Sequence, residues 1–137
     1  MKFTLQSRND IDGFLAVSKT LFQYDTSSSA WTEISVLCRG VIPSARHGLG
    51  FASYGEALYV FGGSAGMKLS PALNDAFQFD ISSMTWTDLT HTITGSSPPP
   101  TVYPGFVSAL DALFVWGGVD SNGRCIRRLR AFSFYMA

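Results

Sequence analysis

The segment of this sequence with the most evident chemistry is a run of arginines near the C-terminal end. Arg124, Arg127, Arg128 and Arg130 lie within seven positions and make up four of the ten basic residues. Guanidinium groups form forked hydrogen bonds with carboxylates and phosphates. The run therefore predicts binding of an acidic or phosphorylated peptide. The alternative is a solvated loop whose charges keep an exposed sheet edge from pairing.

Two glycine pairs, Gly62-Gly63 and Gly117-Gly118, raise the question of a phosphate-binding loop, because Lys68 follows the first pair closely. Such a loop needs Gly directly before the Lys and Ser or Thr directly after it. Met67 and Leu69 occupy those two places. The glycines are therefore predicted to be structural, allowing the backbone to leave a buried strand with positive φ.

Catalytic, cofactor and metal motifs are not recognisable in the sequence. His47 and His91 have no nucleophile or metal-ligand spacing around them, so we predict no enzyme activity, no cofactor and no metal. Cys38 and Cys125 form neither a metal spacing nor a disulfide framework, and each is expected to be a free thiol. A shared redox or metal role of the two cysteines is the alternative.

Composition limits the class of protein. The chain has 137 residues, 46% of them hydrophobic and 15% charged, which is enough apolar material for a folded core. Ten basic residues balance ten acidic ones, so no net field attracts nucleic acid or an anionic membrane. No apolar run reaches the roughly 20 residues that span a bilayer, and no secretory signal is apparent. We expect a cytoplasmic protein without nucleic-acid or membrane partners.

The residues above belong to an internal repeat of 55 residues. Leu58-Tyr59-Val60-Phe61-Gly62-Gly63 returns as Leu113-Phe114-Val115-Trp116-Gly117-Gly118. The same shift relates Phe22-Gln23-Tyr24-Asp25 to Phe77-Gln78-Phe79-Asp80 and to Phe132-Ser133-Phe134, and it relates Trp31 to Trp86. A period of this length is typical of an array of stacked structural units.

Each repeat reads as four short strands. In the second copy these are 48–53, 58–61, 76–80 and 84–89, separated by Gly- and Ser-containing turns. The run 58–61 is apolar without alternation, which predicts burial on both faces between neighbouring sheets. The first copy is degenerate, because it lacks the glycine pair. Its first hairpin is expected from 2–7 and 13–18 around a turn at 9–12.

These motifs resemble the kelch repeat, a blade of a β-propeller. The resemblance rests on a hydrophobic strand ending in Gly62-Gly63, on Phe77 and Phe79-Asp80, on Trp86, and on the preceding Pro43-Ser44-Ala45-Arg46-His47-Gly48. It implies an all-β, kelch-type propeller segment of two to three four-stranded antiparallel blades in an incomplete ring, with Trp31 and Trp86 packed between blades. The expected units are a degenerate first blade at 1–42, a complete repeat at 43–97 and an incomplete third repeat at 98–137. The third copy departs at 98–103 and at Arg130, where the second has Asp75.

The resemblance also implies a function. Kelch-type proteins hold partner peptides with the long loops on one rim, here 35–46, 64–74, 90–104 and 119–128, so we expect a protein-binding scaffold. Residues at this rim are the expected contacts: Arg46, His47, Tyr103, Arg124, Arg127 and Arg128. Arg46 equally suits an ion pair with a carboxylate of its own blade, and His47 suits a structural role.

Two alternatives to the scaffold remain. In the first, the chain is a fragment of a larger kelch-type enzyme; in the second, it is a fragment of a propeller that binds a small ligand or a metal. In both, the active residues lie outside this chain. A standard ring of four to eight blades needs more than three, so a longer parent chain or self-association is expected to complete it. Uncovered blade faces expose apolar surface, which favours self-association.

Overall fold

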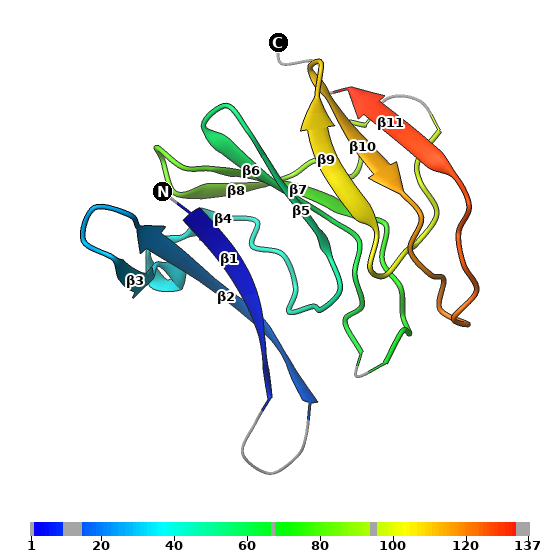
Figure 1. The fold of residues 1–137 in the computed structure, drawn as a ribbon, viewed down its shortest axis with the longest axis horizontal. Helices are drawn as coiled ribbons and strands as arrows, with labels where there is room; N and C mark the ends of the chain where they lie inside the picture. The colour runs from blue at the N-terminus through cyan, green and yellow to red at the C-terminus, as the bar shows by residue number, and fades with distance from the viewer. Residues whose placement is uncertain (1, 10–14, 67, 94–95, 134–137) are drawn as a thin grey trace.

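The protein is a row of three largely antiparallel sheets placed side by side in a computed structural model (Figure 1). The structure describes residues 2–9, 15–66, 68–93 and 96–133, with only the backbone for 2–18 and 132–133. In the described part of the chain, the single helix is a 3-10 turn, η1 (Ser35–Leu37), and no helix has the length and apolarity to cross a membrane. The fold is the expected all-β array of small sheets.

The first sheet contains β1 (Lys2–Asn9), β2 (Leu15–Asp25) and β3 (Ala30–Glu33), in that order. β1 and β2 form an antiparallel hairpin, as expected from 2–7 and 13–18, but its second strand does not end at residue 18. Residues 15–25 form one long strand that pairs with β1 along its length and with β3 at its end. The expected turn at 9–12 falls largely outside the described residues.

The second sheet has five strands. The chain leaves the first sheet through η1 and β4 (Arg39–Gly40), and β4 pairs in parallel with the outer strand β8 (Thr85–Asp88). The other strands are β5 (Gly50–Tyr54), β6 (Ala57–Phe61) and β7 (Ala76–Asp80), giving the order β4-β8-β7-β6-β5. The link from the first sheet is therefore itself part of the second sheet.

The third sheet contains β9 (Gly105–Ala109), β10 (Ala112–Trp116) and β11 (Leu129–Ser133). Its strands pair as β5, β6 and β7 do, but β11 is shifted by two residues relative to the 55-residue repeat. Phe77 lies opposite Val60, whereas Arg130 lies opposite Val115, the repeat partner of Val60. Arg130 therefore does not replace Asp75, as the sequence alignment indicated, but holds the position of Phe77. The repeat bounds at 42/43 and 97/98 are not fixed by these sheets and stay predictions.

Two hydrophobic clusters fill the spaces between the sheets. Leu21 and Ile34 of the first sheet region pack against Leu58, Val60, Phe77, Phe79 and Trp86 of the second. On the other face of the second sheet, Ala57, Tyr59, Phe61 and Ala76 pack against Phe106, Leu113 and Val115 of the third. All five residues of β6 are buried, as its uninterrupted apolar run predicts. Each sheet thus buries one face against each neighbour it has.

The two predicted core tryptophans have different environments. Trp86 is 3% exposed and its ring lies 4.9 Å from that of Phe79. Trp31 makes the same contact with Tyr24, also at 4.9 Å between ring centroids, yet it is 56% exposed. The prediction that Trp31 is buried between sheets is wrong, because no described residues cover that side of the first sheet.

The glycine pairs sit where the chain leaves β6 and β10. All four glycines have positive φ, between 63° and 93°. A Cβ at Gly63 would lie 2.7 Å from the carbonyl oxygen of His47, and one at Gly118 would lie 2.7 Å from that of Val102. At Gly63 and Gly118 both the backbone angle and the close approach of a neighbouring chain segment require glycine.

Asp80 closes the turn between β7 and β8. Its carboxylate accepts hydrogen bonds from the Ser83 backbone N–H at 2.7 Å and from the hydroxyls of Ser82 and Ser83. Asp25 makes the corresponding bonds to Ser27 and Ser28 in the first sheet. The aspartate of the repeat motif therefore stabilises a turn.

Candidate functional site

The long loops emerge at one edge of the three sheets, which we call the loop edge. Gly50 at the start of β5 lies opposite Phe61 at the end of β6, and Phe77 near the start of β7 lies opposite Asp88 at the end of β8. The loop edge therefore carries the described residues of 41–49, 62–75, 89–104 and 117–128. The expected rim loop 35–46 differs, because it contains η1 and the strand β4 and joins this edge only from residue 41. The opposite edge carries the short turns at 55–56, 81–84 and 110–111. Long loops on a rigid scaffold are the usual place for binding side chains.

Arg46 is committed to the interior of the second sheet. It is 3% exposed and forms a two-pronged ion pair with Asp75, with N···O distances of 2.5 and 2.8 Å. It also donates to the carbonyl of Gly62 at 3.1 Å and lies over the ring of Phe77. Of the two roles expected for Arg46, the structure has the ion pair within its own sheet. Its guanidinium is not presented to a partner.

The third sheet repeats the backbone hydrogen bond beside the glycine pair, but with different side chains around it. We call this backbone arrangement the frame. The N–H of Gly62 donates to the carbonyl of Asp75 at 3.1 Å, and that of Gly117 donates to Arg128 at 3.3 Å. Thr101 takes the place of Arg46, because its hydroxyl donates to the carbonyl of Gly117 at 3.2 Å. At the two positions that hold Arg46 and Asp75 in the second sheet, the third sheet holds Thr101 and Arg128.

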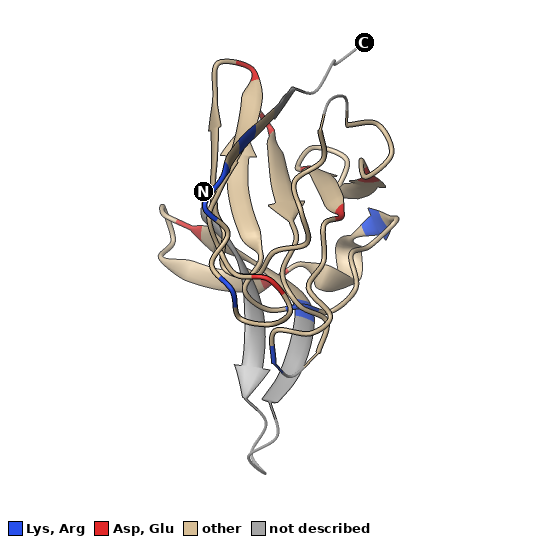
Figure 2. Cartoon of the chain, turned by 90° about the vertical axis from the view of Figure 1, so that its right-hand side faces the viewer, with Lys and Arg blue, Asp and Glu red and all other residues tan. Residues whose placement is uncertain are grey.

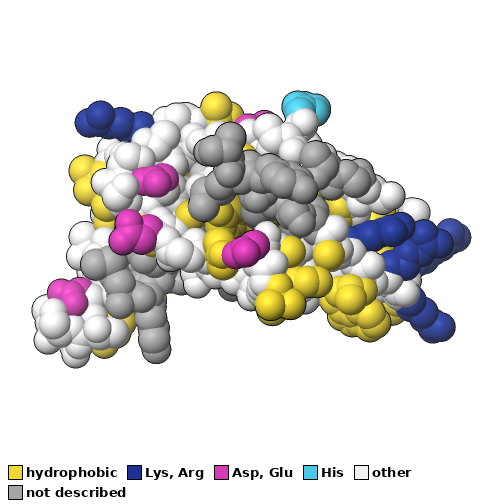
Figure 3. All heavy atoms as spheres, turned by 90° about the horizontal axis from the view of Figure 1, so that it is seen from above, with side chains coloured by type: hydrophobic (Ala, Val, Ile, Leu, Met, Phe, Trp, Pro, Cys, Tyr) yellow, Lys and Arg dark blue, Asp and Glu magenta, His cyan; other side chains and the backbone are white. Residues whose placement is uncertain are grey.

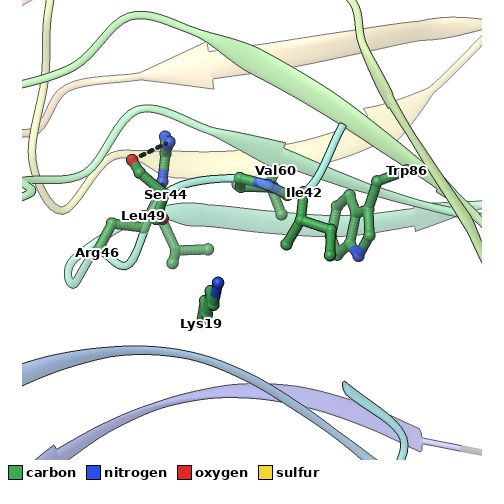
Figure 4. Close-up of a pocket in the computed structure, with 8 residues that line it drawn as sticks. Lys19, Ile42, Ser44, Arg46, Leu49, Val60 and Trp86 are labelled. Carbon is green, nitrogen blue, oxygen red and sulfur yellow. Dashed lines mark hydrogen bonds between the residues drawn. The ribbon is translucent and has the colours of Figure 1, made fainter. Parts of the chain in front are cut away.

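Each of these frames borders a pocket between two sheets. In the second sheet the pocket is lined by Arg46, Ser44 and Val60, and Lys19 of β2 lies across from them (Figure 4). In the third sheet the lining residues in the same positions are Thr101, Pro99 and Val115, and two arginines complete the wall. The same hollow is therefore repeated with different basic residues in its wall, Lys19 and Arg46 in one and Arg128 and Arg130 in the other.

Arg128 and Arg130 both line the pocket of the third sheet, Arg128 exposed and Arg130 partly buried. The Nε of Arg130 is buried without a hydrogen-bond partner among the described residues. The Arg46–Asp75 contact is the one ion pair found in the described residues, so neither arginine has a carboxylate there. The Nε of Arg130 is therefore left able to donate a hydrogen bond to a group outside the described residues.

Arg124 and Arg127 lie in the loop that leads into β11, and both are exposed. Asp120 shapes this loop by accepting backbone hydrogen bonds from Asn122 and Arg124, and the bond from Arg124 lowers the pKa of the Asp120 carboxyl. Figure 2 shows the basic positions along β11 and this loop. Figure 3 shows basic side chains gathered beside apolar ones at that end of the molecule. Below, "arginine patch" means Arg124, Arg127, Arg128 and Arg130.

His47 and Tyr103 come together at the loop edge, although 56 positions separate them. The Nε2–H of His47 donates to the carbonyls of Gly66 and Lys68, at 3.0 and 2.8 Å. Its Nδ1 then accepts from the hydroxyl of Tyr103 at 3.4 Å. His47 is used within the loops, whereas Tyr103 is 60% exposed and free to contact a partner.

Sequence reasoning missed Thr101 and the pocket beside it. It placed Pro98 and Thr101 only as a departure from the motif around Arg46, and it did not identify Asp75 as the partner of Arg46. The sequence did contain a signal for this difference. Thr101 stands 55 positions after Arg46, so the third copy lacks the arginine of the second, while Arg128 and Arg130 follow without a carboxylate at the matching place.

Metal and thiol chemistry have little support in the described residues. No group of three or more His, Cys, Asp or Glu residues in them could hold a metal ion. Cys38 and Cys125 are both free thiols. Partial burial raises the pKa of Cys38, which makes this thiol a weaker nucleophile at neutral pH.

Comparison with known proteins gives one family and several relatives. Residues 8–135 match the model of the KLHDC2/KLHL20/DRC7 Kelch-repeats domain. The chain is 29% identical over 125 residues to the leucine-zipper-like transcriptional regulator 1 homolog of Drosophila melanogaster, covering 88% of this chain and 12% of that protein. It is 32% identical over 107 residues to leucine-zipper-like transcriptional regulator 1 of Mus musculus and of Homo sapiens, covering 75% of this chain and 12% of each relative. The chain thus spans about an eighth of the length of these relatives.

Proposed function

Because this chain belongs to the kelch-repeat family, we propose that it is a protein-binding scaffold without catalytic activity of its own. Its partner is an acidic segment of another protein, held at the loop edge by the arginine patch. Tyr103, exposed at the same edge, supplies an aromatic contact. Arg46 and His47 position the loops and do not touch the partner.

One observation carries this proposal, namely the exchange of charge between two equivalent frames. In the second sheet a carboxylate of the chain neutralises the buried Arg46. In the third sheet Arg128 and Arg130 line the equivalent pocket, and the buried Nε of Arg130 has no acceptor in the described residues. Unpaired buried cations are costly. A carboxylate from a partner would therefore bind there with a charge-assisted hydrogen bond.

The test uses arrays of labelled 12-residue peptides that carry Asp and Glu at varied spacing, each beside a copy with Asn and Gln in their place. We expect the purified chain to bind a subset of the acidic peptides and none of the amide copies. Arg128→Glu should weaken the best peptide by about 10-fold or more, because it both removes and reverses a charge at the pocket. Binding should weaken as salt is raised.

Arg39→Glu is the matched control. Arg39 is exposed on β4, away from the loop edge, and its reversal changes the net charge by the same amount. It should leave binding of the same peptide unchanged. Equal loss in Arg39→Glu and Arg128→Glu would mean that only net charge matters. Undiminished binding by Arg128→Glu would contradict the proposal.

A further inference from the structure

The two ends of the row of sheets leave two apolar faces uncovered in the described residues. On the third sheet, Val107, Trp116 and Leu129 are 55–59% exposed. The register places them on one face, since Trp116 lies opposite Leu129 and Val107 lies opposite Phe114, two residues before Trp116. On the first sheet the uncovered side carries Trp31, 56% exposed. We call these the third-sheet face and the first-sheet face.

The second sheet shows what covers a face equivalent to the third-sheet face. Phe61 holds the place of Trp116 in the repeat and Tyr59 the place of Phe114, and these two residues are 0% and 2% exposed. The group that covers them is Phe106, Leu113 and Val115 on the adjoining sheet. The third-sheet face is therefore shaped to receive another sheet of the same type.

The second sheet also shows what a face equivalent to the first-sheet face packs against. Trp86 and Phe79 pair as Trp31 and Tyr24 do, with ring centroids 4.9 Å apart and planes inclined at 43° and 45°. Trp86 and Phe79 belong to the cluster that closes over Leu21 of the first sheet. Trp31 and Tyr24 therefore form the half of an interface that packs onto a preceding sheet.

We propose that two copies of this chain associate head to tail, the third-sheet face of each copy packing on the first-sheet face of the other. The contact repeats the interface that already joins the sheets within one chain. Head-to-tail contacts form a ring when their rotation closes. Two copies of three sheets make six, which lies within the four to eight sheets of a closed propeller. This inference does not rest on the arginine patch or its partner.

The first measurement is the molar mass of the 137-residue chain by light scattering over a range of concentrations. We expect a species of twice 14.9 kDa, or 29.8 kDa, with no growth to larger assemblies because the ring is closed. Trp116→Asp and Trp31→Asp should each give a monomer, with the dissociation constant raised about 30-fold or more by the loss of a central aromatic contact. Leu110→Asp, at a 93% exposed turn residue off both faces, should remain a dimer.

Mixing the two monomeric variants separates this geometry from others. Trp116→Asp retains a natural first-sheet face and Trp31→Asp retains a natural third-sheet face, so the mixture has one intact contact and should form a mixed dimer. A contact of each face with itself would give no such rescue. A monomeric natural chain at high concentration, or two variants that stay monomeric when mixed, would overturn the proposal.

Folding is checked separately, by circular dichroism and urea unfolding of each variant. Both tryptophans are exposed within one chain, so the variants should fold. Val107→Asp gives a second disruption of the third-sheet face if Trp116→Asp unfolds, and it should be rescued by Trp31→Asp in the same way. The peptide assay above is unaffected by these outcomes, because Arg128→Glu changes neither face.

Discussion

The second and third sheets share a backbone frame and a similar apolar strand, yet differ in burial and in charge. The strands β6 and β10 read Ala-Leu-Tyr-Val-Phe and Ala-Leu-Phe-Val-Trp, but β6 is buried at every residue whereas β10 alternates. Arg46 and Asp75 are paired in the second sheet, and Thr101 and Arg128 stand in their places in the third. The comparison shows that two strands of nearly the same sequence are buried to different extents, depending on whether a second sheet covers them.

The largest contrast is expected at Phe61 and Trp116. Phe61→Ala should lower the free energy of unfolding by about 3–5 kcal/mol, because a fully buried ring is replaced by a cavity. Trp116→Ala should lower it by less than about 1 kcal/mol in dilute solution, where its ring is exposed. Urea unfolding followed by circular dichroism measures both. Equal effects would contradict the description of the third-sheet face as open.

The next contrast concerns the ion pair. Asp75→Ala should lower the free energy of unfolding by about 3 kcal/mol, since it leaves the buried Arg46 without its carboxylate. Arg128→Ala, at the equivalent position of the third sheet, should change it by no more than about 0.5 kcal/mol. The same unfolding experiment compares them. A large loss in Arg128→Ala would show that this arginine has a partner within the chain.

Thr101 should have a smaller effect. Thr101→Val keeps the shape of the side chain and removes its hydrogen bond to the carbonyl of Gly117, so we expect a loss of about 1 kcal/mol. Thr87→Val is the control, because Thr87 is exposed on β8. If both variants unfold at the same urea concentration as the natural chain, Thr101 does not replace Arg46 in holding the glycine pair.

The smallest effect on stability is expected at two equivalent turns, the Asp25 turn of the first sheet and the Asp80 turn of the second. Hydrogen bonds from Ser27 lower the pKa of Asp25 to about 2, and the backbone N–H of Ser83 lowers that of Asp80. Because these pKa values lie below the unfolded value of about 3.9, the stabilisation is complete above it and is lost as the pH falls toward 2. Asp80→Asn should therefore flatten the dependence of the urea midpoint on pH in that interval. An unchanged slope would contradict this role.

The array of small sheets follows from the sequence because its signals are local. The glycine pairs, the apolar run of β6 and the alternation of Phe77 and Phe79 each indicate one feature of one strand, and the 55-residue shift links them. The loop edge follows from strand alternation alone. These parts could be predicted without knowing any contact between distant residues.

The errors arose where a distant contact decides the result. From Gly62 to Ala76 is 14 residues and from Gly117 to Leu129 is 12, so the loop before β11 is two residues shorter. A strand has a period of two, so this change keeps the apolar side chains on the same face and leaves no trace in the pattern. The sequence alignment therefore placed Arg130 two residues away from its true position in the repeat. Likewise, burial of Trp31 depends on a covering sheet, which the residues around it do not reveal.

The strand β4 has a mechanical consequence. The first sheet continues into the second only through this short segment, which is bonded along the outer edge of β8 by Arg39 N–H to the Met84 carbonyl and Val41 N–H to the Trp86 carbonyl. Tension applied to the N-terminal end would load these bonds before it reached β5. Gly40 cannot carry a side chain there, since a Cβ would collide with the Trp86 carbonyl oxygen. The pairing of β4 with β8 would therefore transmit force from the first sheet to the second. We expect Gly40→Ala to break this pairing and lower the force at which the two sheets separate.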